Sequence, residues 1–287
     1  MHPLRSRFPC CSQTPYASRV VASLQARGIA VFALLLSTLA ACDSGGPDDP
    51  VPFVPIAKGT VWTYSVQFRG LDAPSDTFDI AILDRVSLDD LGPRLSPDEP
   101  DSASVWAARF GEHVPSVRWL WAESPHGLHI AGGIAPADTA RTWGLTYAYP
   151  AEVGTEAPVR RYAFSSEQQE FYVREDLPQT LIAVDEPFET PVGTFRTHVY
   201  LYNYRPKDDV AVTWNVYKYV APGVGMVGQV IRSVGLVSGE ERDPPYQILR
   251  LIEHTESGLL DGFEAVPTAS QKTDLPLDAD PFLLGLR

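Results

Sequence analysis

The chain has 287 residues and is acidic: 23 basic side chains face 36 acidic ones, which gives a formal net charge of −13 at pH 7. Nucleic-acid binding depends on basic patches that displace phosphate counterions, so this balance opposes it. The same balance disfavours docking on anionic lipid through charge alone. Apolar residues make up 44% of the chain, which is sufficient for the core of one large domain.

The first 41 residues carry the pattern of an export signal. They include Arg5, Arg7, Arg19 and Arg27 but no Asp, Glu or Lys, and they end in an uncharged run over residues 29–41. A basic segment followed by an apolar one of this length is typical of a signal peptide. The run stops well short of the ~20 apolar residues that a membrane-spanning helix needs. We therefore expect residues 1–41 to be a signal peptide that is removed.

The end of this run, Leu39-Ala40-Ala41-Cys42, resembles the bacterial lipobox. In proteins with that motif the thiol takes a diacylglyceryl group, and a dedicated peptidase cuts before the cysteine. The resemblance implies that Cys42 is the lipidated first residue of the mature protein, and two or more acyl chains give stable membrane anchoring. The alternatives are a buried cysteine in an apolar helix and an ordinary signal peptide cut near an Ala-x-Ala site.

Cys42 is also the only cysteine of the expected mature chain, because Cys10 and Cys11 lie in the signal peptide. The mature part then has no disulfide, no thiolate metal cluster and no cysteine nucleophile. Removal of four arginines leaves 19 basic and 36 acidic side chains, a formal charge of 19 − 36 = −17.

Composition divides the mature chain into three regions. Residues 42–55 are rich in Gly, Pro and Asp, which indicates a lipidated N-terminus followed by a flexible linker. Residues 56–257 are predicted to form one β-rich domain. Residues 258–287 lose the strand pattern but keep scattered apolar residues, and are predicted to be a C-terminal tail.

Within the domain, runs of β-branched and aromatic residues alternate with turn residues, which indicates successive strands. No run of ten or more residues has the apolar spacing of an amphipathic helix. Residues 87–102 are rich in proline and acids and are predicted to be a solvated loop. The expected fold class is mostly β and antiparallel, with few short helices. The predicted strands cover residues 61–68, 77–83, 104–110, 116–122, 127–131, 160–164, 170–174, 180–187, 194–204, 210–220, 225–233 and 246–254.

Three turn motifs give the domain a wider resemblance. They are Pro55 and Gly59 ahead of Trp62-x-Tyr64, then Pro191-Val-Gly-Thr-Phe195, and finally Ala221-Pro-Gly-Val-Gly-Met-Val227. Together they resemble a set of uncharacterised bacterial lipoproteins and periplasmic proteins that is similar to the lipoprotein-localisation-factor fold. The resemblance covers roughly residues 55–254 and implies a single, strongly curved antiparallel sheet or half-barrel. In characterised members of that fold the half-barrel holds acyl chains.

This resemblance makes the aromatic residues of the long strands candidates for a ligand cavity. On a concave face they would bind lipid, whereas in any other sheet the same side chains supply core and cross-strand packing. Both interpretations stay open at this point. The candidates are Phe195, Tyr200, Tyr202, Tyr204, Trp214, Tyr217 and Tyr219.

The sequence offers little support for catalysis or metal binding. His126 and His129 are three residues apart, but in a turn and strand they point to opposite faces. The histidines at positions 113, 198 and 254 lie in separate segments, away from any HExxH or Gly-x-Ser-x-Gly pattern. We therefore expect no catalytic residues, no metal and no cofactor.

The sequence thus predicts a lipid-anchored, non-enzymatic binding or structural module of the bacterial cell envelope. It would be held on the inner or outer membrane, with its body in the periplasm or at the cell surface. One alternative is a carrier or sensor of a hydrophobic ligand such as lipid, and another is an envelope hydrolase. The expected partners are the membrane, through the lipid anchor, and either a hydrophobic ligand or an envelope protein.

Overall fold

The computed structural model describes residues 52–71, 74, 76–110, 114–165, 167–204, 213–235, 238–256, 258, 260, 263 and 277–278. All of these belong to the compact unit Val51–Arg287. The predicted signal peptide, Cys42 and the first part of the predicted linker lie outside the described residues, as does most of the predicted tail. Within the described ranges, no helix combines the length and the apolar character needed to cross a membrane.

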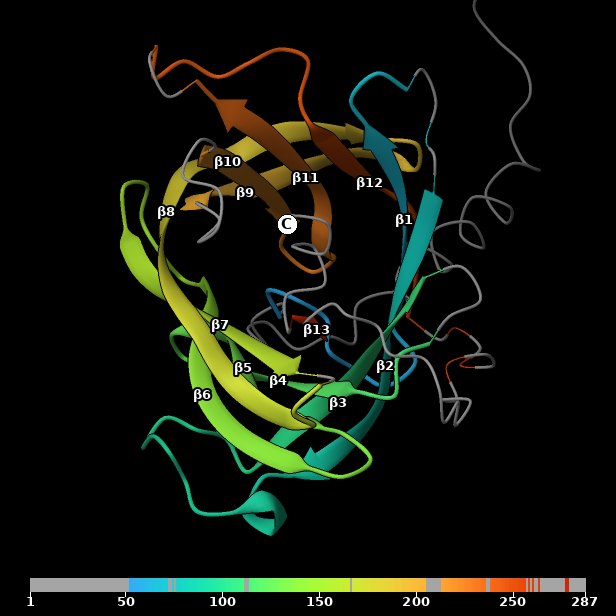
Figure 1. Ribbon diagram of the computed structural model, residues 1–287, viewed down its shortest axis with the longest axis vertical. Coiled ribbons are helices and arrows are strands. Elements are labelled where there is room, and N and C mark those ends of the chain that lie inside the picture. The colour runs from blue at the N-terminus through green and yellow to red at the C-terminus, as the bar shows by residue number, and fades with distance from the viewer. Residues whose placement is uncertain are drawn as a thin grey trace, which may run out of the picture. The chain divides into compact units, whose positions relative to one another are not determined.

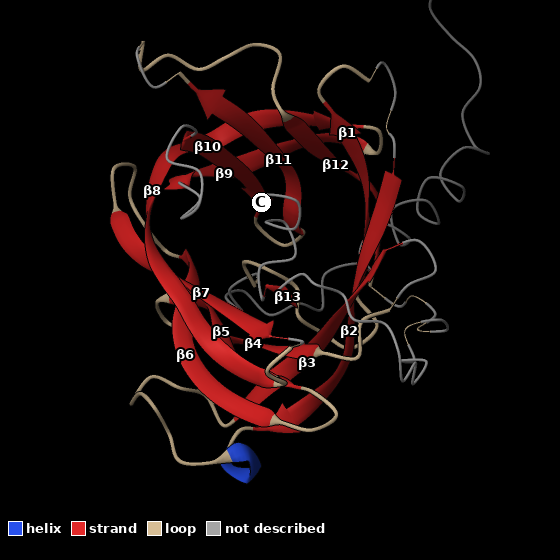
Figure 2. Ribbon diagram, viewed as in Figure 1, coloured by secondary structure: helices blue, strands red, loops and turns tan. Residues whose placement is uncertain are grey.

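The unit is built almost wholly from strands, and its described helical structure is one short 3-10 turn, η1 (Asp89–Leu91) (Figure 2). The strands are β1 (Val61–Phe68), β2 (Asp76–Ser87), β3 (Ser102–Phe110), β4 (Arg118–Ser124), β5 (Gly127–Ile134), β6 (Thr139–Ala148), β7 (Glu156–Ser165), β8 (Glu170–Thr190), β9 (Gly193–Tyr204), β10 (Thr213–Ala221), β11 (Gly225–Val234), β12 (Gln247–Thr255) and β13 (Leu277–Asp278).

All thirteen strands belong to one antiparallel sheet in the order β13-β7-β8-β9-β10-β11-β12-β1-β2-β3-β4-β5-β6. The sheet curls until its two ends come close together, so that it is nearly closed into a barrel (Figure 1). Except for the pairs β13–β7 and β12–β1, strands that are adjacent in the sheet also follow one another in the chain. The predicted fold class, a single strongly curved antiparallel sheet, is confirmed.

Bulges allow the sheet to bend this far. The ladder between β4 and β5 shifts register after Leu120, and the ladder between β5 and β6 shifts twice. One of these shifts lies beside Gly132, which has a φ of 146° and where an added Cβ would sit 2.3 Å from the carbonyl oxygen of Ala140. A bulge increases the local twist and bends the strand that carries it, so these shifts close the sheet at β4, β5 and β6.

The ends of the sheet meet where β6 approaches β7. Gly144 permits this approach, because a Cβ at that position would lie 2.2 Å from the Cβ of Arg160. The Arg160 guanidinium then donates to the carbonyl oxygen of Trp143 at 3.4 Å and pairs with Asp176 at 3.0 Å. A side chain of β7 therefore bridges to the backbone of the edge strand β6.

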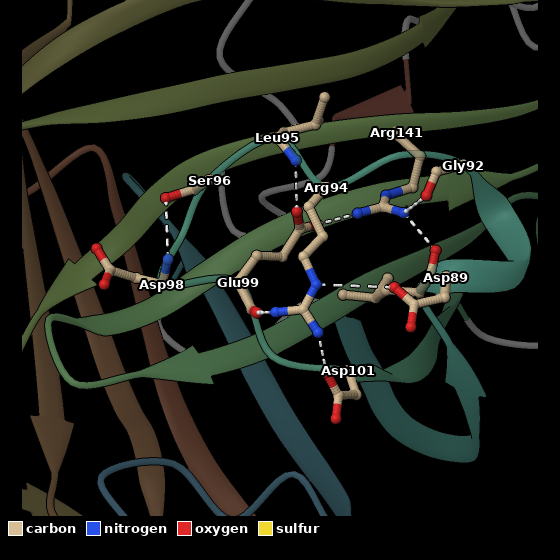
Figure 3. A network of polar contacts seen from close by, with 10 residues as sticks. Asp89, Gly92, Arg94, Leu95, Ser96, Asp98, Glu99, Asp101 and Arg141 are labelled. Carbon is tan, nitrogen blue, oxygen red and sulfur yellow. Dashed lines mark hydrogen bonds and ion pairs between the residues drawn. The ribbon is translucent and has the colours of Figure 1, made fainter.

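The connection between β2 and β3 differs from the prediction of a solvated loop. Leu88 is 1% exposed and the Glu99 side chain is fully buried. Glu99 pairs with Arg141 of β6 and also accepts a hydrogen bond from the backbone N–H of Leu95 at 2.7 Å (Figure 3). The loop is thus held on the outside of the sheet by a buried ion pair, while its prolines and remaining acids stay nearer the surface.

The predicted C-terminal tail has two described points of attachment to the barrel. Phe263 is 3% exposed and packs against Ala81 and Ala107, with the guanidinium of Arg109 over its ring at 4.8 Å. Further on, the backbone of β13 pairs with β7 beside Phe164. The tail region therefore returns to the sheet twice.

Candidate functional site

The two faces of the sheet can be told apart by contacts between strands that are not neighbours. Tyr200 of β9 donates through its hydroxyl to the carbonyl oxygen of Ala148 at the end of β6, at 2.8 Å. Lys218 of β10 places its ammonium 5.5 Å from the ring centre of Tyr147 on β6. Because β6 is at the opposite end of the sheet order from β9 and β10, these side chains meet across the interior. The face that bears them is called the inner face.

Four of the seven predicted cavity residues lie on this inner face. Tyr200 pairs with Lys218, Tyr202 with Val216, and Tyr204 with Trp214, and directly opposed residues in an antiparallel pair share a face. The three tyrosines are each no more than 3% exposed. Trp214 is partly buried at the end of the row, where its ring lies 4.6 Å from that of Tyr246.

The other three predicted residues do not join them. Tyr217 and Tyr219 alternate with Val216 and Lys218 on β10, so they point to the outer face. The ring of Tyr219 stacks on Phe188 at 4.1 Å, and Phe195 is the cross-strand partner of Phe188 in the β8–β9 hairpin. The predicted set therefore divides between two faces, and a ligand-binding role for its inner members stays a prediction.

Tyr217 takes part in an outer-face polar contact. Its hydroxyl donates to the carboxylate of Glu241, and burial together with this bond raises the pKa of Tyr217 to about 12. The same carboxylate accepts a bond from the side-chain amide of Asn215 at 2.6 Å. Tyr217 thus fixes the connection between β11 and β12 to the outside of β10.

The inner face also holds two buried cations that the sequence analysis did not identify. Lys218 is 1% exposed and lies between the rings of Tyr147 and Tyr202, and Arg161 of β7 is 2% exposed with its guanidinium 4.7 Å from the centre of the Tyr204 ring. Aromatic faces attract cations, most strongly where water is excluded. The sequence of β10 could have indicated that Lys218 is buried, because in a strand it shares a face with the apolar Val216 and Val220.

Gln179 adds an unusual polar group to this part of the interior. It pairs with Tyr202 across β8 and β9 and is only 2% exposed. Neither its amide nitrogen nor its amide oxygen has a hydrogen-bond partner among the residues that the structure describes. Burial of an amide without a hydrogen-bond partner is costly in free energy. Gln179 therefore offers an unused donor and an unused acceptor inside the barrel.

The interior between β3, β4, β7 and β8 is filled by aromatic side chains. The rings of Trp106 and Trp121 are 4.7 Å apart, and Trp119 makes edge contacts with Tyr162 at 6.1 Å and Phe171 at 5.6 Å. Such contacts bind opposite walls together and leave the rings little freedom. This side of the barrel is a packed core.

The first described residues close one end of the interior. Phe53 is 4% exposed and stacks on Tyr149 at 4.1 Å, with edge contacts to His198 at 5.5 Å and Tyr200 at 6.3 Å. Val54 is 3% exposed. Both positions fall within the predicted linker of residues 42–55, yet here they are part of the core. The apolar cluster Val51-Pro-Phe-Val54 was the available signal.

Among the described residues, one histidine, His129, has a side-chain nitrogen beside a serine hydroxyl. The ring nitrogen Nδ1 of His129 lies 3.1 Å from the carbonyl oxygen of Gly127 and 3.4 Å from the hydroxyl of Ser124. Since a carbonyl can only accept, Nδ1 carries the proton and cannot act as a base toward Ser124. The His129 ring is 7% exposed and stacks on Trp143 at 4.2 Å. No group of three or more potential metal ligands occurs among the described residues.

Comparisons with known proteins give only distant similarity. No family model matches the chain, and a comparison with curated proteins finds no match. Similar solved structures include a candidate lipoprotein from Parabacteroides distasonis, with a TM-score of 0.41 and 15% identity, covering 72% of this chain and 100% of that one. They also include a candidate exported protein with a YmcC-like fold from Bacteroides fragilis, with a TM-score of 0.42, 11% identity and the same coverage. These likenesses are too distant to support an argument about function.

Proposed function

We propose that this chain is a lipid-anchored protein of the bacterial cell envelope whose barrel acts as a non-enzymatic binding or structural module. The observation that carries the proposal is the lipobox Leu39-Ala40-Ala41-Cys42, which ends ten positions (52 − 42) before the first described residue, Pro52. The buried Phe53 and Val54 support it. They fix the chain to the barrel directly after a short polar connection, as a membrane tether requires.

The experiment is mass spectrometry of the mature protein purified from membranes of a bacterium that makes it. We expect the N-terminal peptide to begin at Cys42 and to carry a diacylglyceryl group. In the Cys42→Ser variant we expect the barrel in the soluble fraction or as an uncleaved precursor. An unmodified N-terminus at or before residue 41 would overturn the proposal.

The absence of enzymatic activity is part of the proposal. It is supported by His129, whose Nδ1 proton is directed to Gly127 rather than left free to activate Ser124. Burial also lowers the pKa of His129, so the ring is neutral at pH 7. A fluorophosphonate probe reacts with activated serines, and we expect it to label the wild-type protein and the Ser124→Ala variant equally weakly. Strong labelling that is lost in the variant would establish the hydrolase alternative.

A carrier of a hydrophobic ligand is the second candidate function. The buried amide of Gln179 favours it, because this side chain lies opposite Tyr202 on the inner face and has no hydrogen-bond partner among the described residues. Native mass spectrometry of protein released from the membrane in mild detergent tests this alternative. A stoichiometric mass of bound lipid in addition to the Cys42 modification would support it, and a ligand-free mass in every preparation would refute it.

A further inference from the structure

The start of the described chain is fastened to one end of the barrel by several independent contacts. The backbone N–H of Gly223 points at the carbonyl oxygens of Pro52 and Phe53, at 3.1 and 3.2 Å. The N–H of Val54 donates to the carboxylate of Glu123. Two residues further on, the carbonyl oxygen of Ile56 accepts from the hydroxyl of Ser104 at 2.6 Å. Together with the burial of Phe53, these contacts make the point of attachment rigid.

The attachment point identifies an end of the barrel, here called the root end. It includes the turns 125–126, 149–155 and 222–224, because the strands alternate in direction and these turns follow β4, β6 and β10. The connection 88–101, which follows β2, lies at the same end. Phe53 stacks on Tyr149 in one of these turns and contacts Gly223 in another. The turns 135–138 and 167–169 follow β5 and β7, and therefore belong to the opposite, far end.

The length of the connection limits how far the root end can be from the lipid. Pro52 lies ten positions after Cys42 (52 − 42), so the chain between them can span at most about 35 Å when fully extended. A random coil of that length has a typical end-to-end distance of about 17 Å. For comparison, the ten residues of β6 extend about 34 Å along the strand, and about 25 Å along the axis of a barrel with tilted strands.

We propose that the root end faces the lipid bilayer and that the far end points away from it. This inference rests on the proposed lipid anchor at Cys42. The short tether and its rigid attachment make the opposite orientation costly, because the far end could approach the lipid only if the chain ran back along the full height of the barrel. The far end is then the surface that a second envelope component would reach first.

Charge at the root end indicates that the tether, and not adhesion, sets this orientation. Glu152 is exposed in the turn 149–155, and Asp98 lies 3.5 Å from His126 in the turn 125–126. Carboxylates repel an anionic lipid surface, and the repulsion is screened within about 10 Å in ordinary salt. On a bilayer that contains anionic lipid, the barrel should therefore remain close to the surface without lying on it.

Energy transfer from the protein to the membrane tests this orientation. A lipid on Cys42 consumes its thiol, so a cysteine introduced at Glu152 (root end) or Ala137 (far end) is the only thiol available for a donor dye. Both positions are exposed. The protein is placed in nanodiscs of phosphatidylethanolamine and phosphatidylglycerol that contain a headgroup acceptor. We expect transfer from position 152 to exceed transfer from position 137 by about twofold or more, since the two differ by about 25 Å in height.

Two controls separate the orientation from the lipid anchor. Residues 43–287 with an N-terminal hexahistidine tag on nickel-chelating lipid test the geometry without natural lipidation. If native protein proves unmodified but this version still shows the order 152 above 137, the anchor assignment fails and the geometry stands. Insertion of 30 Gly/Ser residues after Pro50 should remove the difference, because a coil of 40 residues spans about 35 Å. Equal transfer at the two positions with the short tether, or a higher value at 137, would overturn the orientation.

Discussion

The ion pair between Glu99 and Arg141 should contribute more to stability than any exposed pair on this barrel. The Glu99 side chain is fully buried and that of Arg141 is 8% exposed. Arg141 also donates to the carbonyl oxygen of Gly92 (Figure 3) and to that of Leu88. Removal of one partner from a buried pair typically costs about 3–5 kcal/mol, because the other charge is left without compensation. For Arg141→Met we expect a loss near the lower end, about 3 kcal/mol, since Glu99 keeps its bond from the N–H of Leu95.

Arg94 provides a matched control in the same loop. It pairs with Asp89 and Asp101, but its side chain is 47% exposed, so Arg94→Met should cost under about 1 kcal/mol. The double variant Glu99→Met/Arg141→Met should recover most of the loss, because an apolar pair of similar volume avoids the burial of charge. Urea unfolding followed by tryptophan fluorescence measures all four proteins. Equal losses for Arg141→Met and Arg94→Met, or a loss in the double variant at least as large as that of Arg141→Met alone, would refute the reasoning.

Three further outcomes are expected from the same unfolding assay. Gly228→Ala should cost about 1–3 kcal/mol, since its Cβ would lie 2.1 Å from the Phe188 ring, and the loss should shrink in a Phe188→Ala background. Phe53→Ala should lower the free energy of unfolding by about 3–5 kcal/mol, whereas deletion of residues 42–51 should leave it almost unchanged. Equal effects of the two changes would contradict the packing of Phe53 in the core. Burial lowers the pKa of His129, His198 and His254 in the folded protein, so the unfolded chain binds more protons below pH 6.5. The free energy of unfolding should therefore be level above pH 6.5 and fall below it. A flat profile from pH 5 to 7.5 would contradict these lowered pKa values.

Much of the sheet could be predicted from the sequence because alternation and turn chemistry are local. The motif Ala221-Pro-Gly-Val-Gly-Met-Val227 was placed between two strands, and the structure has it as the turn that joins β10 to β11. β1 was predicted as residues 61–68, the bounds that the structure gives. In both places residues with high strand propensity stand directly next to turn residues, so the local sequence is enough to locate the strand ends.

β8 shows where local patterns fail. It was predicted as two strands, 170–174 and 180–187, but it is one strand of 21 residues. Proline usually interrupts a strand because it lacks an N–H, but Pro178 lies opposite Pro158, so the two positions without an N–H face each other. Bulges near Ile182 and Asp185, the latter with a φ of 57°, interrupt the period of two. β6 was missed for a related reason, since its buried positions are irregularly spaced around Gly144.

The candidate site was harder to predict, because its members come together only through closure of the sheet. Tyr200, Tyr202 and Tyr204 were predicted to share a face, and the register places them on one face. Tyr217 and Tyr219 were grouped with them because they are aromatic, although alternation on β10 sends them to the other side. The contact of Lys218 with Tyr147 joins β10 to β6 across the interior, and no spacing within either strand encodes that contact.

The distribution of side chains inside the barrel limits where any ligand could bind. Between β3, β4, β7 and β8 the rings of Trp106, Trp119 and Phe171 pack on one another, so binding there would require the core to separate. Polar groups gather instead beside β8 and β10, where Gln179 and Lys218 are buried. Phe53 covers the root end of this polar side through Tyr200. Under the proposed orientation, a lipid that entered from the bilayer would have to displace Phe53. The carrier alternative therefore requires the release of a contact that fastens the tether to the barrel.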